Sequence, residues 1–422
     1  QDGDAGDVLR GGDGAAGAQP AHRLCFGLVQ IHGLPHRKMN QFKFSTFPLE
    51  AAHFGFRLRR WDVGARGRGG RSTMVNSLPD DMGPIDPAKR DPNLPPAKYL
   101  GKPHIGQVKH ESDVKGMAWS PDGTMMAAGG YDKKIIIWDV ETFDKVRTIE
   151  TEDWVECLDW SPDGELIGCG GGFDKKGKIY EFETGELMED LEHGGIVYAC
   201  AFAPKANVFA CGCFEKMVTL WHSTRGHMIT SITTEGVLKA LAWHPENTAI
   251  ASGGFCAAVT VWKMNVDEEK PKEEILWRNE LENIAADCRS LAYSADGTKL
   301  VSGDWADKLI LWDSATGEKI WEIANPEEKH YFAVAFSPEM DVVVAGGWDW
   351  RATMYRVADK EKLDDCYIGA ETEDHVGGQT VRNVRFSPDG KVVAFCSDDR
   401  QVHFWPRDDK TRLPIGAEED VE

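Results

Sequence analysis

Hydrophobic and polar positions repeat along the chain from about residue 104. Each repeat has a hydrophobic run ending in an aromatic residue, a turn similar to Ser-Pro-Asp-Gly, and a second apolar run ending in small residues and glycine. A short loop and a third run, which also ends in an aromatic residue, complete the unit. Successive turns lie 41, 42, 41, 50, 43 and 50 residues apart. They begin at Ser120, Ser161, Ala203, His244, Ser294, Ser337 and Ser387.

Two columns of aromatic residues mark the same units. One column precedes the turns and extends from Trp119 to Phe386. The other closes the third run and consists of Trp138, Phe182, Trp221, Trp262, Trp312, Tyr355 and Trp405. Both columns recur in every unit, which indicates seven copies of one supersecondary structure.

The apolar runs have the periodicity of β-strands. They alternate, or are continuously apolar, over about 4–7 residues. Residues 116–139 contain three such runs, and a weaker fourth strand follows at 145–150. Four strands in about 40–45 residues is the pattern of one propeller blade. We therefore predict an all-β chain, a seven-bladed β-propeller of four-stranded antiparallel blades.

The ends of the repeat region indicate how the ring closes. After Trp405 the sequence is too charged, and too interrupted by proline and glycine, to supply the outer strand of blade seven. The alternating segment 103–110 precedes blade one and has no blade of its own. We predict that this N-terminal strand pairs with the last blade and closes the ring.

The columns resemble those of the WD-repeat (tryptophan-aspartate repeat) family of β-propellers, with Trp-Asp pairs at 138–139 and 312–313. The resemblance covers about residues 104–407, and it implies a fold but hardly any particular function. It also implies a buried, hydrogen-bonded set of His, Ser or Thr, Asp and Trp in each blade. The structural residues it assigns are Trp138, Trp221, Trp262, Trp312, Trp405, Asp132, Asp349 and Asp399.

Several positions depart from this family pattern. The matching histidines are only His110 and His193. The other four aspartate positions are taken by Lys176, Glu215, Cys256 and Ala306. No blade carries all four residues of the set, so blade cohesion is expected to depend more on apolar burial than on this network.

Composition and charge divide the chain into four regions: a disordered, spurious or targeting leader (1–73), a proline-rich linker (74–98), the propeller (99–407) and an acidic tail (408–422). The leader has 11 Lys and Arg against 6 Asp and Glu, a net charge of +5. The whole chain carries −21, so the remaining residues carry −26. That charge argues against nucleic-acid binding through bulk charge, and no apolar run is long enough for a transmembrane helix.

The ten cysteines and the lack of a secretory signal favour a reducing compartment, cytoplasmic or nuclear. Import into an organelle through residues 1–73 stays open as an alternative, because part of this leader is rich in arginine and poor in acidic residues.

Two motifs suggest chemistry and have simpler explanations. Residues 172–178 match the start of a phosphate-binding loop, but Ile179 replaces the expected Ser or Thr and a strand follows, so we predict a hairpin turn. Cys169 and Cys211 fall in a repeat column that needs small buried side chains, which accounts for them without a metal. We therefore predict no metal and no cofactor.

A third motif, Trp-Asp-Trp-Arg at 348–351, is similar to a signature by which some WD-repeat proteins dock on a ubiquitin-ligase scaffold. In those proteins the tryptophan closes the third strand, whereas here the motif is expected in the preceding loop. The sequence also lacks the Gly-x-Ser-x-Gly and His-Glu-x-x-His motifs of hydrolases. We predict that the protein is not an enzyme.

Residues at equal offsets form rings around a propeller axis. Five residues before the turns lie Lys115, Glu156, Tyr198, Lys239, Arg289, Phe332 and Arg382. In WD-repeat propellers this offset resembles a position at the mouth of the central channel. Seven residues before the closing aromatics lie Tyr131, Phe214, Phe255, Trp305, Trp348 and Asp398, with Phe173 as the nearest equivalent in blade two, where we infer a two-residue insertion.

The cations in the first ring suggest that an acidic or phosphorylated peptide is the partner. Two alternatives stay open. The cations could pair with Glu111, Glu152, Glu235 and Glu328, which lie nine residues before four of the turns, and the aromatics could be core residues between blades. The function predicted is a non-enzymatic protein-interaction scaffold, a subunit of a larger assembly that docks peptide or protein partners on one propeller face. A substrate-recognition adaptor of a ubiquitin-ligase-like complex and a propeller-class enzyme are the alternatives.

Overall fold

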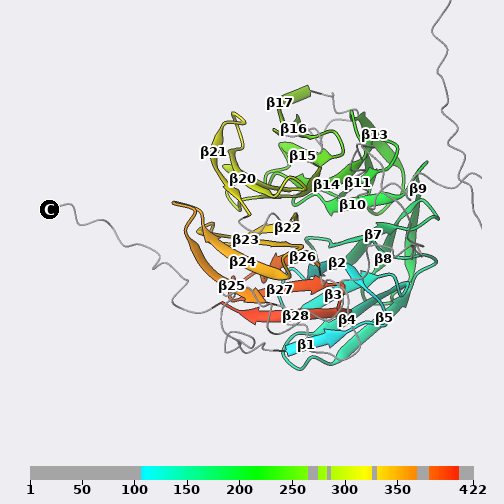
Figure 1. The fold of residues 1–422 in the computed structure, drawn as a ribbon. Helices are drawn as coiled ribbons and strands as arrows, with labels where there is room; N and C mark the ends of the chain where they lie inside the picture. Colours follow the sequence, from blue (N-terminus) through cyan, green and yellow to red (C-terminus); the bar gives the residue numbers. More distant parts are fainter. Residues whose placement is uncertain (1–105, 265–273, 283–286, 326–329, 368–379, 408–422) are drawn as a thin grey trace, which may run out of the picture. The chain divides into compact units, whose positions relative to one another are not determined.

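The computed structural model describes residues 106–264, 274–282, 287–325, 330–367 and 380–407, which form strands β1 to β28 and no helix. The strands are grouped in seven four-stranded antiparallel sheets, which are arranged as the blades of a propeller (Figure 1). The predicted all-β, seven-bladed architecture is confirmed. The described residues include no helix long and apolar enough to cross a membrane.

The first strand of each blade lies innermost, next to the central channel, and the second lies beside it. The innermost strands are β2 (Val114–Trp119), β6 (Cys157–Trp160), β10 (Val197–Phe202), β14 (Leu238–Trp243), β18 (Cys288–Tyr293), β22 (Tyr331–Phe336) and β26 (Val381–Phe386). The second strands are β3 (Met125–Gly130), β7 (Leu166–Gly171), β11 (Val208–Cys213), β15 (Ala249–Gly254), β19 (Lys299–Asp304), β23 (Val342–Gly347) and β27 (Val392–Ser397).

The third strands end in the closing aromatic residue and one more residue. They are β4 (Lys134–Asp139), β8 (Lys176–Glu181), β12 (Met217–His222), β16 (Ala258–Lys263), β20 (Lys308–Asp313), β24 (Arg351–Arg356) and β28 (Gln401–Pro406). The outer strands of blades one to six are β5 (Lys145–Glu150), β9 (Leu187–Glu192), β13 (Met228–Thr233), β17 (Glu274–Glu280), β21 (Lys319–Ala324) and β25 (Lys362–Tyr367).

The outer strand of blade seven is β1 (Gly106–Lys109), which comes from the other end of the repeat region. It pairs antiparallel with β28, with Gly106 opposite Phe404 and Lys109 opposite Gln401, and the two strands lie side by side in Figure 1. The backbone N–H of His110 continues the pairing by donating to the Arg400 carbonyl at 2.9 Å. These residues lie within the segment 103–110, of which 103–105 fall outside the described residues.

The turn between the first two strands is built by its own side chains. In blade one the Ser120 hydroxyl donates to Asp122 at 2.6 Å and accepts the Met125 N–H at 2.9 Å. Gly123 has a φ of 74°, which a residue with a Cβ adopts only with strain. Ser161 and Asp163, and Ser387 and Asp389, repeat the arrangement. This local chemistry explains why the turn sequence recurs.

Apolar packing occurs mainly between blades. Seven buried clusters each combine residues of two neighbouring blades. The junction of blades seven and one, for example, places Val402 and Phe404 against Met117 and Trp119. Burial of apolar surface on this scale is the main stabilising contribution to a fold of this kind. The ring is therefore held together by contacts that exist only once it is assembled.

Blade two corrects one position of the sequence prediction. Ile167 pairs with Tyr180, as Met126 pairs with Trp138 in blade one, so Tyr180 and not Phe182 is the closing aromatic. Tyr180 is buried, whereas Phe182 follows the strand and packs partly buried against Trp160. The two-residue insertion inferred in blade two was therefore too long: four residues separate β7 from β8, against three between β3 and β4, so the insertion is one residue. Counted back from Tyr180, Phe173 occupies the position of its column.

The same correction moves the aspartate position of blade two from Lys176 to Asp174. Asp174 accepts a hydrogen bond from the buried Lys178 ammonium at 2.5 Å, and Glu152 accepts another at 3.2 Å. Lys178 is two residues before the closing aromatic, the position of Thr219 in blade three. There Thr219 accepts hydrogen bonds from Trp221 Nε1 at 2.9 Å and contacts His193 Nε2 at 2.9 Å. Blade two thus replaces the neutral set with a charged one.

The other assigned structural residues hold their blades by different subsets of the family network. His110 Nδ1 lies 2.7 Å from Asp132 Oδ2, and its ring packs against Trp138. Trp262 and Trp312 donate to serines of the second strands, and His403 Nε2 lies 2.6 Å from Asp399 Oδ2. Asp349 accepts from Asn325 at 3.3 Å.

Candidate functional site: the mouth of the central channel

All seven innermost strands contribute to a cavity of about 210 Å³ at the centre of the ring. Every residue of the predicted first ring lines it: Lys115, Glu156, Tyr198, Lys239, Arg289, Phe332 and Arg382. Below them the wall consists largely of small and apolar residues such as Ala199, Ala240 and Leu291. The structure therefore brings the whole predicted ring together in one site, which we call the channel mouth.

β-bulges explain why these side chains point into the channel. The pairing of β2 with β3 shifts between Val114 and Gly116, which leaves Lys115 as the extra residue. The same shift flanks the other members of the ring in blades three to seven. In blade two, Glu156 directly precedes β6. A bulge turns one side chain out of the alternation of its strand and is frequent beside functional sites. The sequence predicts which residues form the ring, but it does not reveal the bulges that turn their side chains into the channel.

One side of the mouth is organised by Asp398 of blade seven. The Arg382 guanidinium donates to both carboxylate oxygens, at 2.8 and 2.7 Å, and the Lys115 ammonium donates to Oδ1 at 3.0 Å. Burial pushes the pKa of Asp398 upward, but these two cations outweigh it and hold the pKa below its usual value. Asp398, which falls in the otherwise aromatic column, thus neutralises much of the positive charge on this side.

The opposite side has a less complete pairing. Arg289 Nε lies 2.7 Å from Asp287 Oδ2, yet neither oxygen of this buried carboxylate accepts a well-formed hydrogen bond. Burial raises the pKa of Asp287 to about 6, although Arg289 and Lys239 both act in the opposite direction. The Lys239 ammonium lies 3.0 Å from the centroid of the Tyr198 ring and 5.5 Å from that of Phe255. Aromatic faces and one poorly bonded carboxylate therefore contact the cations on this side.

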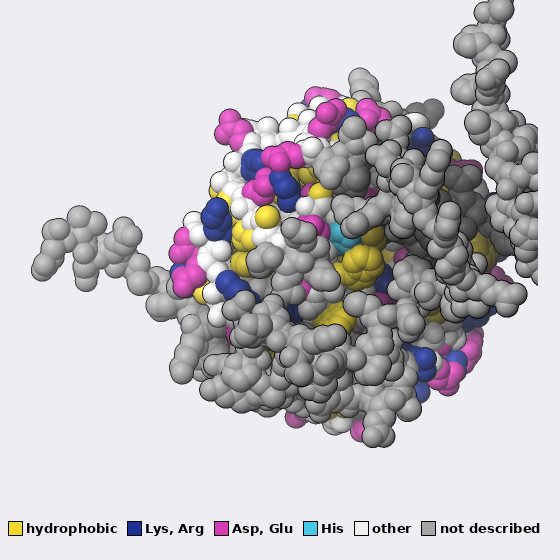
Figure 2. Space-filling model, in the orientation of Figure 1, with side chains coloured by type: hydrophobic (Ala, Val, Ile, Leu, Met, Phe, Trp, Pro, Cys, Tyr) yellow, Lys and Arg dark blue, Asp and Glu magenta, His cyan; other side chains and the backbone are white. Residues whose placement is uncertain are grey.

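Exposed aromatic residues border the same end of the channel. Lys115 lies 4.7 Å from the centroid of Tyr131, and Arg289 lies 4.4 Å from that of Trp305. The side chains of Tyr131, Phe173, Phe214, Phe255 and Trp348 are 40–56% exposed, so the alternative that these aromatics are core residues was wrong for them. Figure 2 shows hydrophobic side chains beside a histidine near the middle of the visible face, with charged side chains towards its edge.

Three contributors to the mouth were missed by the sequence analysis. Arg385 also lines the cavity. His330 stacks on Trp305 with ring centroids 4.2 Å apart and contacts Trp348, and Trp154 lies between Tyr131 and Phe173. Arg385 is three residues beyond Arg382 on the same innermost strand, so the offset could have revealed it. His330 and Trp154 both lie seven residues before their turns, so a further offset could have revealed them as well.

The alternative that glutamates nine residues before the turns pair with the mouth cations was wrong for the three that the structure describes. Glu111 pairs with Lys134, Glu152 with Lys178 and Glu235 with Arg278, while Glu328 lies outside the described residues. Among the described residues, Asp287 and Asp398 pair with mouth cations, and Asp113 lies 3.7 Å from Lys115.

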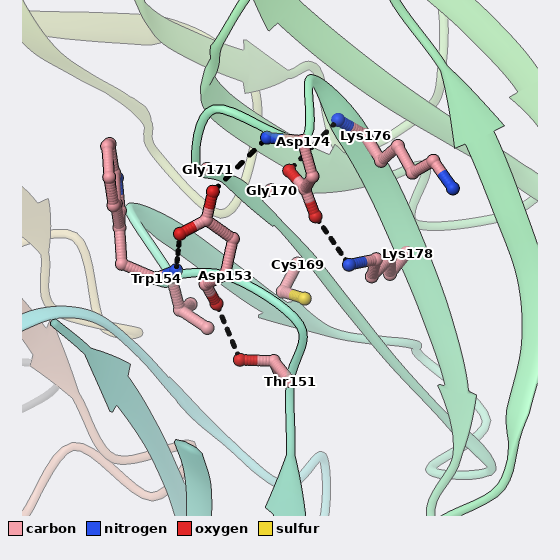
Figure 3. A pocket seen from close by; sticks show the side chains of 10 residues that line it. Thr151, Asp153, Trp154, Cys169, Gly170, Gly171, Asp174, Lys176 and Lys178 are labelled. Carbon is pink, nitrogen blue, oxygen red and sulfur yellow. Dashed lines mark hydrogen bonds and ion pairs between the residues drawn. The ribbon is translucent and has the colours of Figure 1, made fainter. Parts of the chain in front are cut away.

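A second, much smaller cavity of about 10 Å³ lies in blade two (Figure 3). Asp153 accepts the backbone N–H groups of Phe173 and Asp174, and Asp174 in turn accepts from Lys178, so the groups around this cavity bond to one another. Residues 172–175 form the turn between β7 and β8, which confirms the predicted hairpin in place of a phosphate-binding loop.

Two other motifs also lie where the sequence places them. The column of Cys169 and Cys211 is buried in every blade, as predicted, and burial raises the pKa of both thiols. Within the described residues, no three His, Cys, Asp or Glu side chains are grouped to hold a metal. Trp348, Asp349 and Trp350 lie in the turn before β24, not at the end of a third strand.

Comparisons with known proteins match this architecture. The family model described as "WD domain, G-beta repeat" matches residues 103–139, 143–181, 185–222, 281–313 and 370–406. Protein HIR1 of Chaetomium globosum is 32% identical over 104 residues, which are 24% of this chain and 10% of that protein. Guanine nucleotide-binding protein subunit beta-1 of Drosophila melanogaster is 31% identical over 99 residues, which are 22% of this chain and 29% of that protein.

The match to transcriptional corepressor LEUNIG_HOMOLOG of Arabidopsis thaliana extends over 306 residues at 24% identity, 70% of this chain and 36% of that protein. The chain thus spans between a tenth and about a third of the length of these relatives. Five matched repeats, seven four-stranded blades and the closing Trp residues agree with one another. The chain belongs to the WD-repeat family of β-propellers.

Proposed function

We propose that this protein is a non-enzymatic interaction scaffold that docks an acidic segment of a partner protein at the channel mouth. The observation that carries the proposal is the convergence of bulged cations and exposed aromatics on one end of the channel, in a chain whose net charge is −21. A local cationic patch on an otherwise acidic protein attracts anionic groups of a partner. The patch does not repel the protein's own acidic surface or the aromatic side chains of the partner.

The two sides of the mouth have different roles in this proposal. Arg382 and Lys115 are already engaged by Asp398 and mainly give the wall its shape. Arg289 and Lys239 receive the acidic group, because Asp287 satisfies Arg289 only partly. The exposed aromatics Phe255 and Trp348 supply apolar contact beside the charges, which is the usual composition of an interface anchor. Carboxylate and phosphate share the chemistry that Arg289 recognises.

The protein is further proposed to work as one subunit of a multiprotein assembly, in the cytoplasm or nucleus. The nine described cysteines are all free thiols, which suits a reducing compartment. Relatives of this chain include a protein named as a transcriptional corepressor. A propeller offers several faces, so docking at the mouth leaves the blade edges available to other subunits.

Photo-crosslinking tests the docking site. A photoreactive amino acid at Phe255, on the mouth, is compared with one at Met188, which is 52% exposed on outer strand β9. We expect the Phe255 position to capture peptides rich in Asp, Glu or phosphate, identified by mass spectrometry, and the Met188 position to capture none of these. Equal capture at both positions, or peptides without acidic residues at Phe255, would contradict the proposal.

A further inference from the structure

Outer strand β13 differs from the outer strands of the other blades because none of its side chains is charged. Its sequence is Met-Ile-Thr-Ser-Ile-Thr. The outer strands β1, β5, β9, β17, β21 and β25 all contain Lys, Arg, Asp or Glu. Charged side chains on an edge strand, lysine above all, prevent it from pairing with another chain. β13 lacks this protection and is rich in β-branched residues, which favour strand pairing.

The outward edge of β13 has backbone groups available for pairing. β13 comes last in the order β10-β11-β12-β13, so no strand of the described residues pairs with its other edge. The N–H of Thr234 donates to the carbonyl of Lys216, just before β12, at 2.8 Å. Successive residues of a strand direct their backbone groups to opposite sides. The backbone groups of Ser231 and Thr233 therefore face away from β12, and the Thr233 side chain is exposed.

We propose that β13 is an interface between two copies of this chain, in which the two β13 strands pair antiparallel about a two-fold axis at Ser231. The third blades of the two copies then form one continuous sheet. The inference is independent of the docking proposal, because the channel mouth and the outer edge of a blade are different surfaces.

The sequence of β13 is complementary to itself in this arrangement. The axis places Ser231 opposite its own copy and Ile229 opposite Thr233. It also places Thr230 opposite Ile232. Pairs of β-branched and hydroxyl residues stabilise antiparallel strands, and no like charges meet here. The same axis sets the available backbone groups of Ser231 and Thr233 opposite the equivalent edge of the second copy, so that hydrogen-bonding positions coincide.

The residues that flank β13 are basic on one side and acidic on the other. The turn before the strand contains exposed Arg225 and His227, and Glu235 after the strand is 68% exposed. Antiparallel pairing brings the start of each strand towards the end of the other, so the basic turn of one copy lies near Glu235 of the second copy. This local complementarity opposes the repulsion between two chains of net charge −21.

The size of the interface sets its strength. Stable, specific complexes bury about 1,200–2,000 Å² in total, and one strand from each chain covers less than this. We therefore expect a reversible dimer with a dissociation constant on the order of 10 µM. A two-fold pair uses the outward edge of both strands, so association stops at the dimer.

Sedimentation of the full chain at increasing concentration tests the interface. Ser231→Glu sets two carboxylates opposite each other in the dimer, and the blade accommodates the change because Glu322 of β21 has the same offset from its paired strand. Thr148→Glu makes the same kind of change at the equivalent position of β5 and is the matched control. A second pair of variants is His227→Glu alone and combined with Glu235→Lys, which reverses the two flanking groups.

The wild type and Thr148→Glu should dimerise alike, whereas the Ser231→Glu dimer should dissociate at least about tenfold more readily. His227→Glu should weaken the dimer, and adding Glu235→Lys should restore it. Hydrogen exchange in a peptide that covers residues 228–234 should slow as the concentration rises. A wild type that stays monomeric, a Ser231→Glu variant that dimerises like the control, or association beyond the dimer would overturn the proposal. Slow exchange at every concentration would also overturn it, because a segment of the same chain would then cover β13.

Discussion

Replacing Arg382 by glutamine tests how much the hydrogen bonds of Asp398 with Arg382 and Lys115 stabilise the channel mouth. Arg382 and Asp398 side chains are 28% and 15% exposed and are joined by two charge-assisted hydrogen bonds. Such bonds contribute about 1.5–3 kcal/mol when a charged group is involved. Partial exposure screens the pair, and Lys115 stays 3.0 Å from Asp398. We therefore expect the free energy of unfolding to fall by about 1–2 kcal/mol at neutral pH.

The pH dependence of that loss identifies its cause. The pKa of Asp398 lies below its usual value in the folded protein, so the carboxylate stabilises the fold above about pH 4 and this contribution is lost as the pH falls through the folded pKa. Without Arg382, the folded pKa rises towards the unfolded value. The difference between the wild type and Arg382→Gln should thus be constant from about pH 5 to 7 and shrink towards about pH 3.

Urea unfolding followed by tryptophan fluorescence at several pH values measures both effects. Lys391→Gln is the matched control, because the Lys391–Asp389 pair is 64% and 54% exposed and its loss should cost no more than about 0.5 kcal/mol. The reasoning is refuted if Arg382→Gln unfolds like this control at neutral pH. It is equally refuted if the difference from the wild type grows as the pH falls.

Three further substitutions test how the blades are held together, each by the shift of the urea midpoint. In Gly116→Ala the new Cβ would lie 2.7 Å from the Leu158 backbone nitrogen of the next blade, so a loss of about 1–3 kcal/mol is expected, and an unchanged midpoint would contradict this close approach. Thr219→Val removes the shared partner of Trp221 and His193 and should cost about 1–3 kcal/mol; a loss below about 0.5 kcal/mol would show that the contact is dispensable. Lys178→Met leaves Asp174 without its ammonium partner and should destabilise the chain. Lys178→Thr combined with Thr151→His places the threonine and histidine of blade three at their offsets in blade two and should recover most of the loss; equal loss in both variants would refute the equivalence of the two sets.

The parts of this fold that were predictable depend on local chemistry. The Ser-Asp-Gly turns form hydrogen bonds among their own residues, and the closing aromatics pair with apolar residues of the second strand. Both features therefore give a recognisable sequence pattern in every repeat. In blade two this pattern gave the wrong closing aromatic, because Tyr180 and Phe182 are both aromatic and only the pairing with Ile167 distinguishes them. An aromatic at the end of a strand and one just after it give the same sequence signal.

The site was predictable in its membership but not in its pairing. Equal offsets placed all seven ring residues at the channel, because rotation about one axis preserves offset. Partners of the cations depend instead on irregular loops and on neighbouring blades. Lys115 and Asp398 are 283 residues apart in the chain and meet only because the ring closes. Asp287 lies seven residues before its turn, at the offset of Asp113, but the other five blades carry no acidic residue there, so the column gave no acidic pattern.

The affinity of the captured acidic segment for Asp287→Asn tests docking at the mouth most directly. Removing this carboxylate frees Arg289 of its internal competitor, so a synthetic peptide of that segment should bind more tightly than it binds the wild type, while Lys239→Gln should bind it more weakly. The pKa of Asp287 is about 6, so protonation should also strengthen wild-type binding between about pH 7.5 and 5.5 and give Asp287→Asn a smaller gain. Weaker or unchanged binding by Asp287→Asn at about pH 7.5 would contradict the account.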